Sequence, residues 1–168
     1  LHAYTTEIAL KNHLSRGCLD LTETSIKMPK EGDKIKFTNY YKKLSIPVGS
    51  TLSANSSFTF NVNTHVIIWG TYIASNAFFN GGVILNYGTM TIGPTYNRNY
   101  AGGIIINYGV INAAYDYSKI TNYGTIINTP TGVLNVPIEN AAGSLTPGNA
   151  FNGQVINFST TSITGVTT

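Results

Sequence analysis

The sequence has little cysteine, little charge and no long apolar run, and each shortage excludes a class of protein. The one cysteine, Cys18, excludes an internal disulfide framework and a cysteine-based metal site. Charged residues make up 10% of the chain, whereas an average soluble domain contains about 25%. No stretch approaches the run of about 18 apolar residues that a membrane-spanning helix needs, so the sequence predicts no membrane span.

The few charges are concentrated near the N-terminus. The net charge of +3 comes from a segment, "KMPKEGDKIKFTNYYKK", in which Glu31 and Asp33 interrupt the basic residues. This mixture of signs is typical of a solvated face or a terminal cap, so we expect no nucleic-acid partner. After Lys43 the only charged side chains are Arg98, Asp116, Lys119 and Glu139.

Residue types that carry catalysis are sparse. His2, His13 and His65 lie far apart, and no histidine pair has the spacing of a zinc site. Carbohydrate-cleaving enzymes need clustered carboxylates, whereas only Asp116 and Glu139 lie within the repeats described below. No phosphate-binding glycine motif occurs. We therefore expect no enzymatic activity, no metal ion and no cofactor.

What the chain does contain is a repeat. The segment "GVILNYGTMTI" (82–92) returns as "GIIINYGVINA" (103–113) and "SKITNYGTIIN" (118–128), and a more divergent copy, "GQVINFSTTSI", follows at 153–163. A β-branched residue stands four positions before each aligned glycine, and an aromatic residue stands one position before it. The aligned positions are 18, 21, 15 and 35 residues apart, at Gly70, Gly88, Gly109, Gly124 and Ser159. A repeat of this period decides the fold class before any other feature does.

Each copy has the local pattern of β-structure, with short Val-, Ile-, Thr- and Tyr-rich runs bounded by Gly and Asn. Repeats of this length are too short for propeller blades of about 40 residues and fit one coil of a solenoid. We predict an all-β parallel β-helix or β-solenoid with irregular 15–21-residue coils over residues 44–168. Residues 1–43 are predicted to form a charged N-terminal cap or assembly arm. The segments 93–103 and 128–150 are interpreted as loops inserted at corners, the second with a degenerate coil at 133–138.

In such a solenoid the Asn-Tyr-Gly tripeptide is predicted to form a corner. The glycines supply the positive φ of the bend, at Gly70, Gly88, Gly109 and Gly124. The asparagines turn inward and bond to their equivalents in neighbouring coils, forming a ladder of Asn86, Asn107, Asn122 and Asn157. The aromatic residues form a stripe of Trp69, Tyr87, Tyr108, Tyr123 and Phe158.

The segment that precedes these coils completes a family resemblance. Its pattern is P-x-G-x-T-L, at Pro47, Gly49, Thr51 and Leu52. With the coils that follow, residues 44–163 resemble a degenerate repeat of adhesin-like and fibre-like surface proteins of microbes and viruses. The chain departs from that repeat in having Tyr or Trp where short polar residues are frequent, and in its irregular period. The resemblance implies an extracellular location or a place on a cell or virion surface.

Two functional hypotheses follow. The first is a structural subunit of an extracellular fibre, filament or surface appendage. This subunit would assemble into a homo-oligomer or polymer through end-to-end β contacts between its N-terminal segment and an exposed solenoid end. The alternative for the N-terminal segment, and the one that we favour, is that it caps its own chain. The second hypothesis is a monomeric carbohydrate-binding or adhesive module that holds glycans on the aromatic stripe.

Overall fold

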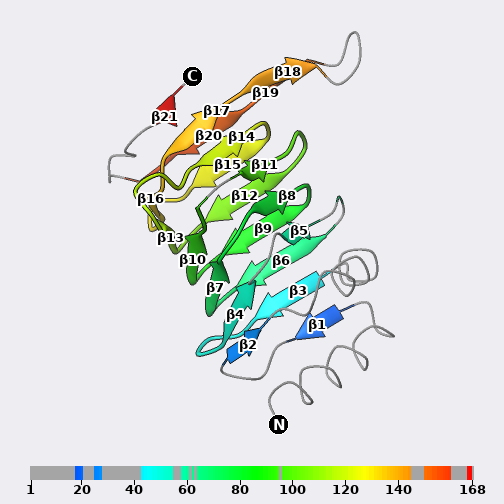
Figure 1. The fold of residues 1–168 in the computed structure, drawn as a ribbon, viewed down its shortest axis with the longest axis vertical. Helices are drawn as coiled ribbons and strands as arrows, with labels where there is room; N and C mark the ends of the chain where they lie inside the picture. The colour runs from blue at the N-terminus through cyan, green and yellow to red at the C-terminus, as the bar shows by residue number, and fades with distance from the viewer. Residues whose placement is uncertain are drawn as a thin grey trace.

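The computed structural model is an all-β parallel β-solenoid, as the repeat predicts (Figure 1). It describes residues 18–20, 25–27, 43–54, 58–60, 62, 64–94, 96–144, 150–159 and 166–167. These ranges contain strands, turns and bends but no helix, and hence no helix long and apolar enough to cross a membrane.

Successive strands along the chain are distributed over three parallel sheets, named A, B and C below. Sheet A has seven strands in the order β1 (Cys18–Asp20), β3 (Lys43–Ile46), β6 (His65–Ile68), β9 (Val83–Asn86), β12 (Ile104–Asn107), β15 (Thr125–Asn128) and β20 (Gln154–Asn157). Sheet B has six, in the order β2 (Ser25–Lys27), β4 (Thr51–Ala54), β7 (Thr71–Ala74), β10 (Thr89–Ile92), β13 (Val110–Ala113) and β16 (Val133–Asn135). Sheet C has six, in the order β5 (Phe58–Phe60), β8 (Phe78–Asn80), β11 (Asn97–Asn99), β14 (Ile120–Asn122), β17 (Ile138–Asn140) and β21 (Val166–Thr167).

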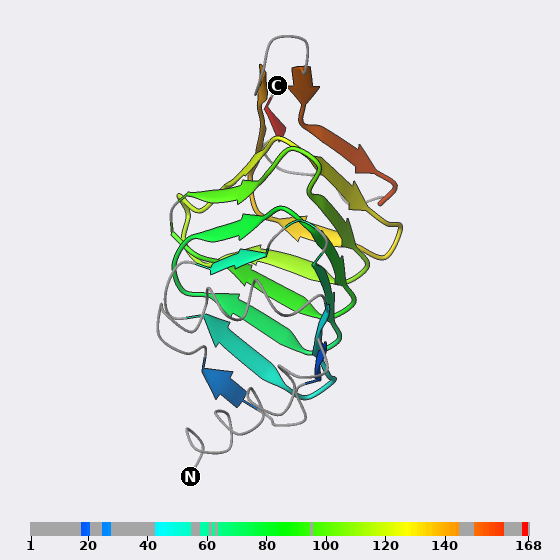
Figure 2. The ribbon, with the colours of Figure 1, turned by 90° about the vertical axis from the view of Figure 1, so that its right-hand side faces the viewer.

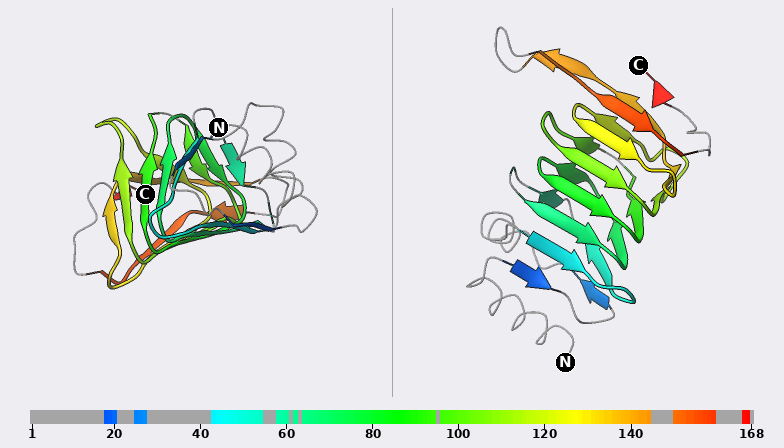
Figure 3. Two further views of the ribbon diagram at one scale, coloured as in Figure 1. Left: turned by 90° about the horizontal axis from the view of Figure 1, so that it is seen from below. Right: turned by 180° about the vertical axis from the view of Figure 1, so that it is seen from behind.

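The coils stack along one long axis, from β1 at one end to β20 at the other (Figures 1 and 2). An antiparallel hairpin of β18 (Ala142–Ser144) and β19 (Ala150–Asn152) interrupts the last coil and projects at the C-terminal end. Viewed along the long axis, the strands of the three sheets surround one interior (Figure 3, left).

The interior is built from columns of equivalent side chains. Strands alternate between half-exposed and buried positions, because successive residues of a strand point to opposite faces. The register of sheet A stacks one inward column in the order Val66, Ile84, Ile105 and Ile126, all fully buried, and ends it at Val155. Burying each such side chain stabilises the fold by roughly 1.5–3 kcal/mol, which explains the β-branched column in the sequence.

Three corners connect the sheets within the stack. The A–B corner joins sheet A to sheet B at 47–50, 69–70, 87–88, 108–109 and 129–132. The B–C corner joins sheet B to sheet C, for example at 93–96 and 114–119. The C–A corner joins sheet C to the next strand of sheet A at 81–82, 100–103, 123–124 and 141–153. Most differences in repeat length arise at the last two corners.

Two segments that the sequence presented as inserted loops contain strands. The segment 93–103 holds β11, and the segment 128–150 holds β16, β17 and β18. The interpretation as loops is therefore wrong for these parts. The degenerate coil expected at 133–138 is real, because β16 and β17 supply the sheet B and sheet C strands of the coil that β15 begins.

Most of the predicted N-terminal cap or arm lies outside the described residues. Two strands of this region are described. β1 pairs with β3 and β2 pairs with β4, both in parallel. This part of the N-terminal segment therefore continues sheets A and B of its own chain.

Candidate functional site: the solenoid corners

A ladder of asparagine side chains runs along the A–B corner. The Nδ2 of Asn86 donates to Oδ1 of Asn107 at 2.8 Å, and Asn107 donates in the same way to Asn128 at 2.8 Å. Asn128 donates to Asn157 at 2.9 Å. Asn107 Nδ2 also donates to the backbone oxygen of Val133 at 3.1 Å. Because the first three asparagines are fully buried, these bonds link successive coils where water does not compete.

A second ladder of the same construction runs along the C–A corner. Asn80 donates to Asn99 and Asn99 to Asn122, both at 2.8 Å, and Asn122 donates to Asn140 at 2.9 Å. Asn99 also bonds to the backbone oxygen of Gly103 at 3.1 Å. The solenoid thus has two parallel amide ladders, where the sequence predicted one.

The third Asn-Tyr-Gly copy belongs to the second ladder, so its predicted alignment with the first two copies is wrong. Asn122 stands in register with Asn99 and Asn140 of sheet C, whereas Asn86 and Asn107 stand in register in sheet A. The 15-residue step from Gly109 to Gly124 is therefore a step between corners. Bonded neighbours in the first ladder are 21 residues apart at both Asn86–Asn107 and Asn107–Asn128.

Four ladder members were not predicted from the sequence: Asn80, Asn99, Asn128 and Asn140. Asn128 had a visible signal, because "TIIN" at 125–128 repeats the "IIIN" of 104–107. The other three end short strands of sheet C and are followed by Gly, Tyr and Ala. Their only common mark in the sequence is the asparagine itself.

The corner glycines are required for a different reason from the predicted one. Positive φ occurs at Gly49 and Gly102, but not at Gly70, Gly88, Gly109 or Gly124. At these four positions the backbone passes directly over the backbone of the coil below. A Cβ on Gly88 would lie 2.0 Å from the oxygen of Gly70, and one on Gly124 would lie 2.2 Å from the oxygen of Gly103. Contacts this short exclude every other residue type.

The predicted aromatic stripe is divided between the corners. Trp69, Tyr87 and Tyr108 stack along the A–B corner, with ring centroids 4.1 Å and 4.6 Å apart and planes within 10° of parallel. Phe158 follows Asn157 at the same corner, two coils beyond Tyr108, and is exposed. Tyr123 lies at the C–A corner, where its backbone N–H bonds to the oxygen of Asn99.

The B–C corner carries further exposed tyrosines. Tyr115 and Tyr117 stack 5.4 Å apart and are 51% and 65% exposed. Reciprocal bonds between Tyr115 and Ser118 hold their turn: Ser118 N donates to Tyr115 O, and Tyr115 N donates to Ser118 Oγ. On the preceding coil, Tyr96 is 71% exposed and has a φ of 55°, which is rare for a bulky residue. Exposed aromatic side chains therefore project from the turns of this corner.

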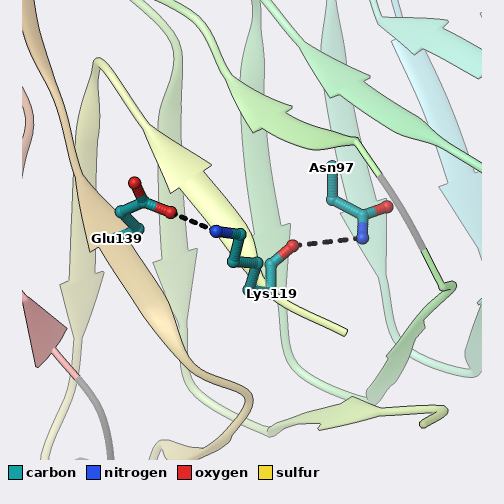
Figure 4. A network of polar contacts seen from close by, with 3 residues as sticks. All are labelled: Asn97, Lys119 and Glu139. Atoms are coloured by element: carbon teal, nitrogen blue, oxygen red, sulfur yellow. Dashed lines mark hydrogen bonds and ion pairs between the residues drawn. The ribbon is translucent and has the colours of Figure 1, made fainter. Parts of the chain in front are cut away.

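Polar contacts tie these turns to the stack, as Figure 4 shows. Asn97 Nδ2 donates to the backbone oxygen of Gly93 at 2.9 Å. It also donates to the backbone oxygen of Lys119 at 3.2 Å. The Lys119 ammonium pairs with the Glu139 carboxylate of the next coil. Both side chains of the pair are about half exposed, so it contributes little to stability.

Two buried polar atoms have no hydrogen-bond partner within the described part of the chain: Tyr72 Oη and Asn86 Oδ1. Tyr72 packs between Phe60 and Phe78 in the core, and burial raises the pKa of its hydroxyl above the ordinary value. Asn86 begins the first ladder, and the equivalent position of the preceding coil is Ile68. Its Oδ1 therefore faces a side chain that cannot donate.

Within the same described ranges, no three His, Cys, Asp or Glu side chains lie close enough together to hold a metal ion. Comparison with known proteins finds no matching protein family, no matching curated protein and no matching solved structure. The class that the fold itself defines is a parallel β-solenoid.

Proposed function

We propose that the protein is a structural subunit of an extracellular fibre, filament or surface appendage, in which the solenoid is a stiff rod. The observation that carries this proposal is the continuity of hydrogen bonding along the axis. Three parallel sheets and two buried amide ladders connect every coil from β9 to β17 with its neighbours. Such a rod resists bending and local opening, and its role is mechanical, so it requires no catalysis.

An extracellular location agrees with the surface chemistry of the solenoid. Beyond Lys43 the chain relies on Asn, Thr, Ser and Tyr for polarity and has four charged residues, Arg98, Asp116, Lys119 and Glu139. The resemblance to adhesin-like and fibre-like repeats favours the same location.

End-to-end assembly is supported by the state of the last coil. In β15 the inward residues Ile126 and Asn128 are fully buried. In β20 the equivalent Val155 is only partly buried and Asn157 is exposed. Among the described strands, β20 is the last of sheet A at this end and β1 the last at the other. An exposed strand edge accepts another strand, so joining β20 of one copy to β1 of the next would extend sheet A head to tail.

The test is imaging of the purified protein over a range of concentrations, together with a variant of the exposed end. The wild-type protein should form filaments or defined oligomers. Val155→Lys should abolish them, because it places an ammonium group in the column that the next copy must cover. Gln154→Lys adds the same charge on the outer side of the strand and should still assemble. A protein that stays monomeric at every concentration, or equal assembly by both variants, would contradict the proposal.

A second candidate function, a carbohydrate-binding or adhesive module, is favoured by the tyrosines of the B–C corner. Stacking on a sugar needs an accessible aromatic face, and Tyr115 and Tyr117 are 51% and 65% exposed, whereas Tyr87 and Tyr108 at the A–B corner are each 38% exposed. The rings of Tyr115 and Tyr117 stack on each other, so one face of each ring is not covered by the other ring. A hydrogen bond from Tyr115 to Ser118 holds the turn that carries them. In a glycan array, Tyr117→Ala should remove any binding, whereas Tyr108→Ala should retain it. Loss with Tyr108→Ala alone would contradict this placement.

A further inference from the structure

The outer faces of the three sheets differ in polarity. On sheet B six half-exposed outward positions are polar, Thr51, Ser53, Thr71, Thr89, Thr91 and Asn112, and three are apolar, Ile73, Val110 and Val133. On sheet C they are Thr59, Phe79, Arg98, Thr121 and Glu139, of which only Phe79 is apolar. On the middle strands of sheet A, by contrast, the same positions are aliphatic. Only the inward side chains form the core, so the core of the described coils does not account for this apolar outer face.

The outer face of sheet A consists of stacked columns in register. The main column is Ile67, Leu85, Ile106, Ile127 and Ile156. The second column beside it is apolar only at its centre, in the order His65, Val83, Ile104, Thr125 and Gln154. At the A–B corner the stacked rings of Trp69, Tyr87 and Tyr108 lie next to the main column. Charged groups do not occur on β9, β12, β15 or β20, the strands that carry most of these side chains.

We propose that this face, called the sheet A face below, is a self-association surface that packs against the sheet A face of a second copy. A contiguous apolar patch on a soluble protein marks an interaction site, and two flat sheets pack face to face about 10 Å apart. The proposal is independent of the end-to-end contact, because it uses the side of the rod and not its ends.

The strand spacing favours a second copy as the occupant. Columns on the sheet A face recur at the inter-strand distance of about 4.8 Å. A second copy has the same spacing over the same number of strands, so its side chains can interdigitate along the whole face. Two-fold symmetry brings the same patch of each copy together. β12 lies at the centre of the five strands from β6 to β20, so Ile106 would lie close to its own counterpart.

The area of the face sets the expected strength of the dimer. Five strands at about 4.8 Å and five residues at about 3.3 Å give roughly 400 Å² in projection. A stable interface buries about 800 Å² of accessible surface from each partner. The sheet A face should therefore support a weak dimer that forms at high protein concentration.

The experiment measures association by sedimentation equilibrium in a Val155→Lys background, which removes the end-to-end contact. We expect a weak, reversible monomer–dimer equilibrium between about 10 μM and about 1 mM protein. Ile106→Lys should weaken the dimer at least about tenfold, since it buries an unpaired ammonium group at the centre of the face. Thr121→Lys places the same charge on the outside of sheet C and should leave the equilibrium unchanged. A monomer at all concentrations, or equal weakening by both variants, would overturn the proposal.

A cysteine experiment keeps the test decisive if Ile106→Lys does not fold. In a Cys18→Ser background, Ile106→Cys should form an intermolecular disulfide under mild oxidation, because the two-fold axis places the two sulfur atoms near each other. Thr121→Cys should stay monomeric under the same conditions. Equal dimer yields from both would overturn the proposal. The single variant Ile106→Lys, in which Val155 is unchanged, should still form filaments, because the end-to-end contact does not use Ile106. The end-to-end proposal and the sheet A face proposal can therefore fail separately.

Discussion

Two copies of the Asn-Tyr-Gly tripeptide lie at different corners of the solenoid and make different backbone hydrogen bonds. One copy, 107–109, lies at the A–B corner, and the other, 122–124, lies at the C–A corner. At the A–B corner both N–H groups, of Tyr108 and Gly109, donate to the oxygen of Asn86 in the coil below. At the C–A corner Tyr123 donates to the oxygen of Asn99, and Gly124 donates to the side-chain Oδ1 of Asn122 in its own turn. The side-chain oxygen of Asn122 therefore accepts a hydrogen bond from the glycine of its own corner, whereas the glycine that follows Asn107 donates to the coil below.

The comparison shows what the tripeptide specifies. Both corners need an inward amide that bonds to the next coil, a residue that can point outward, and a position without Cβ where two backbones cross. Asn-Tyr-Gly meets these local needs at either corner. The choice between corners is made by strand pairing, which depends on contacts about 20 residues away in the chain.

The largest expected effect is on replacing a ladder amide by a carboxylate. Asn107→Asp removes the donor to Asn128 and buries a charge, so it should cost about 4 kcal/mol of unfolding free energy at pH 7. Asn122→Asp should cost less, because the Gly124 N–H already points at that oxygen. Chemical denaturation of both variants measures the difference. Equal losses of unfolding free energy in the two variants would contradict the difference in hydrogen bonding between the two corners.

The pH dependence of Asn107→Asp has a defined sign. Burial raises the pKa of the introduced carboxyl above its unfolded value of about 3.9. Its neutral form is therefore favoured in the folded state, so stability is highest below about pH 3.9 and falls as the pH rises towards the folded pKa. Relative to the wild-type protein, the variant should regain stability on acidification. A deficit that does not change with pH would contradict the burial of this site.

The corner glycines should behave alike at both corners. Gly109→Ala and Gly124→Ala each place a Cβ within 2.2 Å of a backbone oxygen, and each should cost about 3 kcal/mol. Gly102→Ala is the matched control, since Gly102 has a φ of +82° but no atom within 4 Å of the added Cβ. Its cost should be about 1 kcal/mol. A Gly109→Ala cost no greater than this would disprove the close approach of stacked corners.

The start of the first ladder offers a smaller test. Ile68→Asn places a donor beside the unpartnered Oδ1 of Asn86, whereas Val66→Asn, on the same strand, introduces an equally buried amide below Ile84. Both should destabilise the core, but Ile68→Asn should cost about 2 kcal/mol less. Thermal unfolding of the pair measures this difference. A larger cost for Ile68→Asn would mean that the ladder cannot be extended.

The smallest expected effect separates the aromatic residues of the two corners. Tyr87 stacks against two rings, at 4.1 Å and 4.6 Å, whereas Tyr100 at the C–A corner stacks against Phe79 at 5.9 Å. Tyr87→Ala should therefore cost about 1 kcal/mol more than Tyr100→Ala. The single tryptophan, Trp69, gives an independent signal, because its fluorescence should change in Tyr87→Ala and not in Tyr100→Ala.

The sequence predicts the solenoid and the inward columns because these depend on local alternation. Ile84 and Ile105 carry the same pattern on both sides, and stacking them requires only that the coils be parallel. The register of Asn122 could not be predicted in this way. Its neighbours "SKITNYGTIIN" match those of Asn86 in type, and the competing partner, Asn99, lies in "TYNRNYAGG", which has none of the flanking apolar residues of the repeat.

The role of the glycines was also beyond local reasoning. A glycine before a strand indicates a bend, and positive φ is the usual local explanation. At Gly88 the constraint comes from the oxygen of Gly70, which is 18 residues earlier in the chain. Only the stacked coils bring that oxygen to the glycine, so the residue type was predictable from the sequence and its physical cause was not.

The most direct test of the account is a cysteine cross-linking experiment on the register of the third copy. In a Cys18→Ser background, the pair Arg98→Cys and Thr121→Cys would occupy directly opposed positions of β11 and β14, within the reach of a disulfide. The pair Ile106→Cys and Thr121→Cys would be opposed only if all three Asn-Tyr-Gly copies shared one corner. We predict an intramolecular disulfide for the first pair and none for the second, read by mass spectrometry. The reverse result would contradict the two-corner solenoid.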